Sequence, residues 1–118
     1  MNRTVMNLAP NHENAKSYYG KAKVVETNDG IFLQSYETEV ADLDSSNRLT
    51  FSAGDWAYSR TTCRHVKEFC WYLNDSGRIP NLMQIMEEIQ RKEKVKSFSG
   101  LVQRIYWIDK DGKYEVRD

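Results

Sequence analysis

The chain has 118 residues, enough for one domain with a hydrophobic core and few for a second. Hydrophobic residues make up 40% and aromatic residues 12%, which argues against wholesale disorder. Seventeen basic residues balance seventeen acidic ones, whereas general polyanion-binding proteins usually carry a basic excess. No apolar run approaches the roughly 20 residues that span a bilayer, and the N-terminus lacks the apolar stretch of a signal peptide. We therefore expect a cytoplasmic protein without membrane contact.

The N-terminal segment is polar and is predicted to be a flexible arm. Residues 1–16 include one proline and four asparagines, with at most a short extended piece around Val5 and Leu8. We expect residues 17–118 to form a single α+β domain.

Four short strands are predicted to follow as an antiparallel meander. Their ranges are 22–27, 31–36, 38–43 and 48–52, and tight turns separate them. The step Asp29-Gly30 between the first two strands is among the strongest short signals for a hairpin.

A helix is predicted from Ser59 or Thr61 to Leu73, because either hydroxyl can cap its first turn. Helical spacing puts Val66 and Phe69 on one face with Leu73, and this face should be buried. The residues expected to meet it are Leu33, Val40, Leu49 and Phe51.

A second helix is predicted to begin near Asn81, which with Gln84 resembles a capping box. A turn at 97–100, a strand at 101–108 and a terminal hairpin ending with 113–116 should follow. The expected fold class is therefore α+β: an antiparallel sheet, made of the four-stranded meander plus the C-terminal hairpin, packed against two helices.

The first predicted helix carries the candidate partner-binding residues on its outward face. Arg60, Arg64, Lys67 and Trp71 fall within a sector of about 60° at helical spacing. Three cations beside an indole can bind an acidic partner, or hold a phosphate backbone while a base stacks on the indole.

A plainer interpretation is a solvated helix face. In it, Arg64 pairs with Glu68 four residues on, and Trp71 folds over the helix end onto Asn74 or the sheet edge, or tucks under the 74–78 loop if the helix ends early. Exposed indoles are uncommon without a use, so Trp71 also suggests contact with a partner or with a second copy of the chain.

No set of residues predicts catalysis or a metal site. His65 lies beside the core face without a recognisable triad partner, and we expect it to bond a loop carbonyl. Cys63 and Cys70 are seven residues apart on one helix, about 10 Å along its axis, which is too far for a disulfide. We expect both to be small buried hydrophobes, and we expect no cofactor and no enzyme activity.

Two segments of the chain carry recognisable motifs, a strand pair of the form SYxTxVA and a helix of the form TTxRHxxEF. The matching residues are Ser35, Tyr36, Thr38, Val40, Ala41, Thr61, Thr62, Arg64, His65, Glu68 and Phe69. These segments resemble a small domain family of tailed phages and related mobile elements whose function is unknown. The resemblance covers roughly half of the chain, from Tyr19 to Leu73, and implies a phage or prophage product acting inside a bacterium.

We therefore expect a non-enzymatic accessory protein that binds and modulates or inhibits a bacterial host protein or nucleoprotein complex. A CRISPR nuclease is one example of such a target. The alternative is a small nucleic-acid-binding domain that uses the basic face of the first helix.

Overall fold

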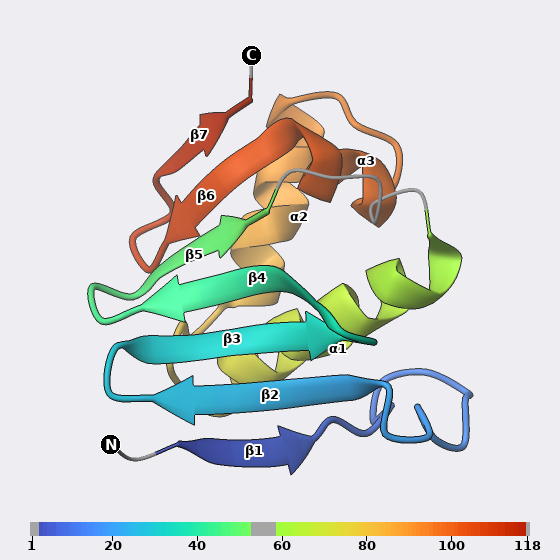
Figure 1. Cartoon of the computed structure of the whole chain (residues 1–118). Helices are drawn as coiled ribbons and strands as arrows, with labels where there is room; N and C mark the ends of the chain where they lie inside the picture. The colour runs from blue at the N-terminus through green and yellow to red at the C-terminus, as the bar shows by residue number, and fades with distance from the viewer. Residues whose placement is uncertain (1–2, 53–58, 118) are drawn as a thin grey trace.

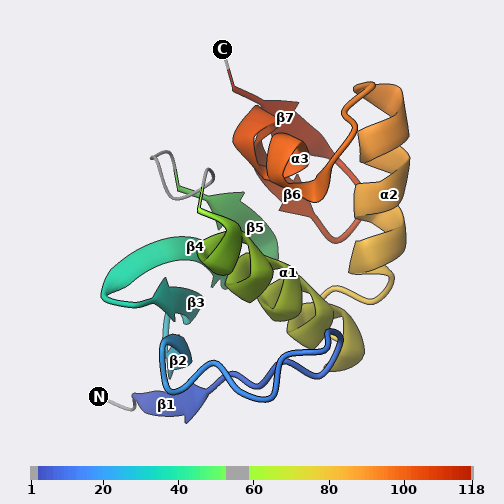
Figure 2. The same cartoon turned by 90° about the vertical axis from the view of Figure 1, so that its right-hand side faces the viewer.

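The computed structural model describes residues 3–52 and 59–117, and the predicted α+β fold is confirmed (Figure 1). The strands of the described part are β1 (Thr4–Asn7), β2 (Ala22–Thr27), β3 (Gly30–Ser35), β4 (Thr38–Asp44), β5 (Arg48–Phe51), β6 (Ile105–Asp109) and β7 (Tyr114–Val116). Its helices are α1 (Arg60–Asp75), α2 (Leu82–Lys92) and α3 (Phe98–Arg104). The strands lie in chain order in one antiparallel sheet, and α1 and α2 cover one of its faces (Figure 2).

The predicted meander is present as β2 to β5, with each strand within one residue of its expected range. Asn28 and Asp29 form the two-residue turn between β2 and β3, and Gly30, which pairs with Thr27, begins β3. Side chains on the helix-facing row run across the sheet in register, from Val24 to Leu33 and then to Ala41. This row is buried because α1 packs against it.

The core forms where the sequence predicts it. Val66, Phe69 and Leu73 of α1 are fully buried. They share one hydrophobic cluster with the expected sheet residues Leu33, Val40, Leu49 and Phe51. The amphipathic period of α1 therefore fixes which of its faces points to solvent.

The predicted strand at 101–108 is wrong over its first half, which instead forms the third helix, α3. Ser97 caps this helix, since its hydroxyl accepts the backbone N–H of Gly100 at 3.0 Å. Leu101 and Val102 are both buried within this helix. The strand β6 begins only at Ile105.

The N-terminal segment also differs from the expected frayed arm. Residues 4–7 form β1, which pairs with β2 along its whole length. The backbone N–H of Leu8 donates to Ala22 at 2.8 Å, and the Leu8 side chain is buried. The segment beyond Leu8 then runs alongside α1 (Figure 2).

The predicted capping box at the start of α2 is wrong. Asn81 has φ of 67° and its side chain makes no cap hydrogen bond. The cap comes from the end of α1, because the Asn74 Oδ1 accepts the backbone N–H of Met83 at 3.0 Å. A residue from the preceding helix thus satisfies one of the open amides of α2.

Candidate partner-binding surface on helix α1

Helix α1 begins where a hydroxyl caps it and presents its cations to solvent. The Ser59 hydroxyl accepts a hydrogen bond from the backbone N–H of Thr62. Ser59 is one of the two residues predicted to cap this helix. The side chains of Arg60, Arg64 and Lys67 are exposed on the face away from the core.

The structure brings these three cations together around one hollow. This basic hollow has a volume of about 350 Å³, and Phe98 and Ser99 of α3 form its other wall. No carboxylate of the described part of the chain lines it. Such a hollow attracts anionic groups, because three positive charges share a recess between two helices.

The cations are also without ion-pair partners among the described residues. The expected pair between Arg64 and Glu68 does not form, because Glu68 is buried and bonds elsewhere. Lys67 lies with its Nζ 5.7 Å from the centre of the Phe98 ring. The charges of this face are therefore available to a partner.

A second groove of about 450 Å³ adjoins the basic hollow, and Lys67 and Phe98 line both. The groove lies among all three helices and its lining is mixed: Trp71 and Met83 lie among polar and charged side chains, which include Gln84, Glu87, Gln90 and Lys96. All four predicted surface residues therefore line one or other of two adjoining recesses. Methionine and aromatic walls of this kind adapt to apolar side chains of different shapes.

His12 covers one face of the Trp71 indole. The two rings stack with centroids 4.5 Å apart and an interplanar angle of 4°. His12 is held by the buried Glu68, which accepts from its backbone N–H at 2.9 Å and lies 2.6 Å from its Nδ1. The Nε2 lies 3.2 Å from Asp75. Trp71 is thus half-buried by the N-terminal segment, neither fully exposed nor tucked under the 74–78 loop as the two interpretations expected.

Replacing His12 with alanine should expose Trp71 and destabilise the fold. The loss leaves the buried Glu68 carboxylate without its side-chain partner, which costs about 1–3 kcal/mol. Fluorescence quenching of Trp71 by acrylamide, measured with Trp56 and Trp107 changed to Phe, should increase in the His12→Ala protein.

Asn11→Ala is the matched control, since Asn11 is exposed and its side chain forms no hydrogen bond to α1 in the described part of the chain. It should leave both quenching and stability unchanged. Equal quenching of Trp71 with and without the His12 ring would contradict the stacked arrangement.

His65 is buried in a polar network between α1 and β3. Its Nδ1 lies 2.7 Å from the Ser35 hydroxyl, which also lies 3.1 Å from the hydroxyl of Thr62. The expected bond to a loop carbonyl is therefore wrong, since a strand hydroxyl takes its place. Burial lowers the pKa of His65 and favours the neutral ring. Ser35 is itself buried, so its hydroxyl is not presented to solvent as a nucleophile.

The two cysteines of α1 differ in environment. Cys70 is fully buried, as expected, and burial raises its pKa. Cys63 is half-buried and lines the basic hollow, which corrects the expectation that it belongs to the core. Burial also raises the Cys63 pKa, against a smaller opposing effect of the Ser99 hydroxyl.

Fold and surface define an α+β protein with a cationic hollow and an adjoining groove of mixed lining on its helical side. The chain belongs to a family of unknown function, DUF8033, whose model matches residues 6–85. The match runs from β1 into α2, and it contains both resembling segments and all four predicted surface residues. Comparison with curated proteins and with solved structures finds no match. No helix in the described ranges is long and apolar enough to cross a membrane.

Proposed function

We propose that this protein is a non-enzymatic binding module that docks onto an acidic surface of another protein through α1. Carboxylates of the partner enter the basic hollow, where Arg60, Arg64 and Lys67 supply the opposite charge. An apolar side chain of the partner enters the adjoining groove beside Trp71. The observation that carries this proposal is the continuity of the two recesses through Lys67 and Phe98. Charged groups then set orientation and association rate, and apolar contact supplies affinity.

A protein partner fits this surface better than a nucleic acid does. The groove walls include Trp71 and Met83, which are partly exposed and suit aliphatic or aromatic side chains. The chain as a whole has no net charge, whereas binding to a phosphate backbone draws on many cations at once. Three cations in one recess match the size of an acidic cluster on a protein.

The resemblance to a phage and mobile-element family supports a partner inside a bacterial host. We infer that the partner is a host protein or nucleoprotein complex in the cytoplasm, of which a CRISPR nuclease is one example. Binding there would block or redirect the partner's own interactions, which requires no catalytic group on this chain.

Capture from nuclease-treated bacterial lysate tests the proposal. The tagged wild-type protein should retain a specific partner protein. The double variant Arg60→Glu with Arg64→Glu should retain at least about tenfold less, because it places negative charge in the basic hollow.

The matched control is Lys110→Glu with Lys113→Glu, which makes the same charge change on exposed residues of the β6–β7 turn. It should retain the partner as the wild type does. Equal loss in both double variants, or no retained protein, would contradict the proposal. Retention that needs nucleic acid, and weakens steeply with salt, would favour the alternative of direct nucleic-acid binding.

A further inference from the structure

A third hollow, of about 430 Å³, lies between the N-terminal segment, the turn after β3 and α1. The segment contributes Tyr18, Tyr19 and Lys21, the turn contributes Tyr36, and α1 contributes His65 among others. Its volume falls in the range of small-molecule sites, about 300–1,000 Å³. It shares one residue, Arg64, with the basic hollow, and the rest of its lining takes no part in the proposed partner contact.

Two of its tyrosines are exposed and held in an unfavourable backbone conformation. Tyr19 is 79% exposed with φ of 53°, and Tyr36 is 49% exposed with φ of 58°. The left-handed region disfavours residues with a Cβ, and such strain gathers at binding sites. Both tyrosines therefore line the hollow, although a left-handed backbone is unfavourable for them and exposure to water is unfavourable for their rings.

His65 offers this hollow a hydrogen-bond acceptor. The Ser35 hydroxyl lies between the Thr62 hydroxyl and the Nδ1 of His65, and with Ser35 donating to Thr62 it accepts the Nδ1–H, which leaves the lone pair on Nε2. The Nε2 has no hydrogen-bond partner among the described residues, although the His65 side chain is 1% exposed and lines the hollow. A ligand N–H would satisfy it.

The remaining polar groups are a second acceptor and two cations. Glu13 lies at the hollow and accepts from the Tyr18 hydroxyl at 3.0 Å. Lys21 and Arg64 are exposed there, and neither forms an ion pair with the described residues. The hollow thus combines aromatic rings, acceptors for N–H groups and cations for an anion.

We propose that this hollow binds a nucleoside monophosphate. The base packs against the rings of Tyr19 and Tyr36 and donates N–H groups to His65 and Glu13. The phosphate lies against Lys21 and Arg64. A nucleotide has all three features in one molecule of suitable size: a planar ring, N–H donors and a phosphate.

Calorimetric titration of the whole protein with AMP, GMP, CMP and UMP tests the site. At least one of them should bind saturably below about 1 mM. Tyr36→Asn and Lys21→Ala should each weaken binding by about tenfold. Asparagine tolerates the left-handed backbone at position 36, so the first variant should fold normally. Arg64 is left unchanged because it also lines the basic hollow.

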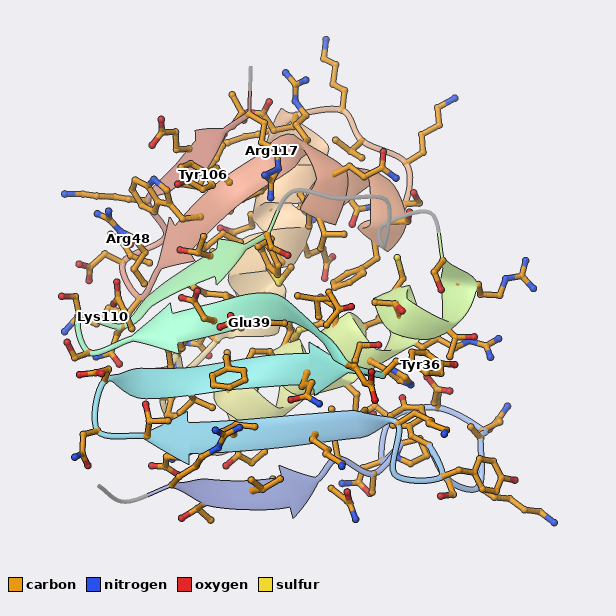
Figure 3. All side chains as sticks on the ribbon, in the orientation of Figure 1. Tyr36, Glu39, Arg48, Tyr106, Lys110 and Arg117 are labelled. Carbon is orange, nitrogen blue, oxygen red and sulfur yellow. The ribbon has the colours of Figure 1, made fainter. Side chains whose placement is uncertain are left out.

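The matched controls are Tyr106→Ala and Lys110→Ala, which remove an exposed ring and an exposed cation. Both residues lie on the left in Figure 3, whereas Tyr36 lies on the right. They should leave the affinity within about twofold of wild type. In NMR spectra, the ring resonances of His65 should shift on saturation.

Four results would overturn the nucleotide site. One is that none of the four nucleotides binds saturably at concentrations up to about 10 mM, tenfold above the highest expected dissociation constant. The second is affinity that survives Tyr36→Asn and Lys21→Ala or falls equally in the controls. The third is an equal affinity for inorganic phosphate alone, which would show that no base is recognised. The fourth is unchanged His65 resonances at saturation.

Discussion

Phe69→Ala should lower the free energy of unfolding by about 3–5 kcal/mol. Phe69 is fully buried at the centre of the contact between α1 and the sheet, with Leu33 and Phe51 in the same cluster. Its loss removes a large apolar surface from the core and leaves a cavity that rigid strands cannot close. This is a large share of the stability of a protein of this size.

Urea unfolding followed by circular dichroism measures this change. Lys67→Ala is the control on the same helix, because Lys67 is exposed and should change stability by less than about 0.5 kcal/mol. A loss below about 1 kcal/mol for Phe69→Ala would show that the helix faces the sheet with another side.

Gly30→Ala should destabilise the protein by about 3 kcal/mol or more. Gly30 has φ of +146°, and a Cβ there would lie 2.2 Å from the backbone oxygen of Leu43. Backbone strain of this kind costs about 1–3 kcal/mol, and the clash with β4 adds to it. Since the clashing atom belongs to the sheet, no side-chain movement relieves it.

Gly20→Ala is the matched control, measured by the same unfolding experiment. Gly20 also has a positive φ, +74°, but no atom of the described residues lies within 4 Å of the position that an alanine Cβ would take. It should cost about 1 kcal/mol, from the left-handed backbone alone. Equal losses at the two glycines would mean that β3 and β4 separate readily at this turn.

The parts of the fold that local chemistry determines could be predicted from the sequence. The Asp29-Gly30 step indicates a tight turn from local sequence alone, and the turn lies there, with Asn28 and Asp29 in it and Gly30 at the start of β3. The apolar stripe of α1 repeats at helical spacing and places Phe69 in the core. The same periodicity places Arg60, Arg64 and Lys67 on one exposed face.

The parts that depend on distant segments could not be predicted. Glu68 and His12 are 56 residues apart in the sequence. The hydrophobic spacing that predicts the faces of a helix does not predict where an irregular segment packs against it. The Ser35 and His65 pair likewise requires β3 to lie against α1. Once the fold is known, the burial of the Glu68 carboxylate is the signal that a partner must exist.

The recesses beside α1 could be only half predicted. Their cationic wall follows from helical spacing, but Phe98 and the rest of the other wall come from α3. The alternation of residues from Leu101 to Ile108 is typical of a strand. The Ser97 cap instead starts a helix that includes residues 101–104. A pattern of seven residues is too short to choose between these structures without tertiary contacts.

Hydrogen exchange of the purified complex with the captured protein tests the central claim most directly, because it locates the contact on this chain. The account predicts slower exchange on binding in peptides that cover residues 60–71 and 98–101, with little change at the β6–β7 turn. Protection confined to β3 and β4, with α1 unchanged, would contradict it.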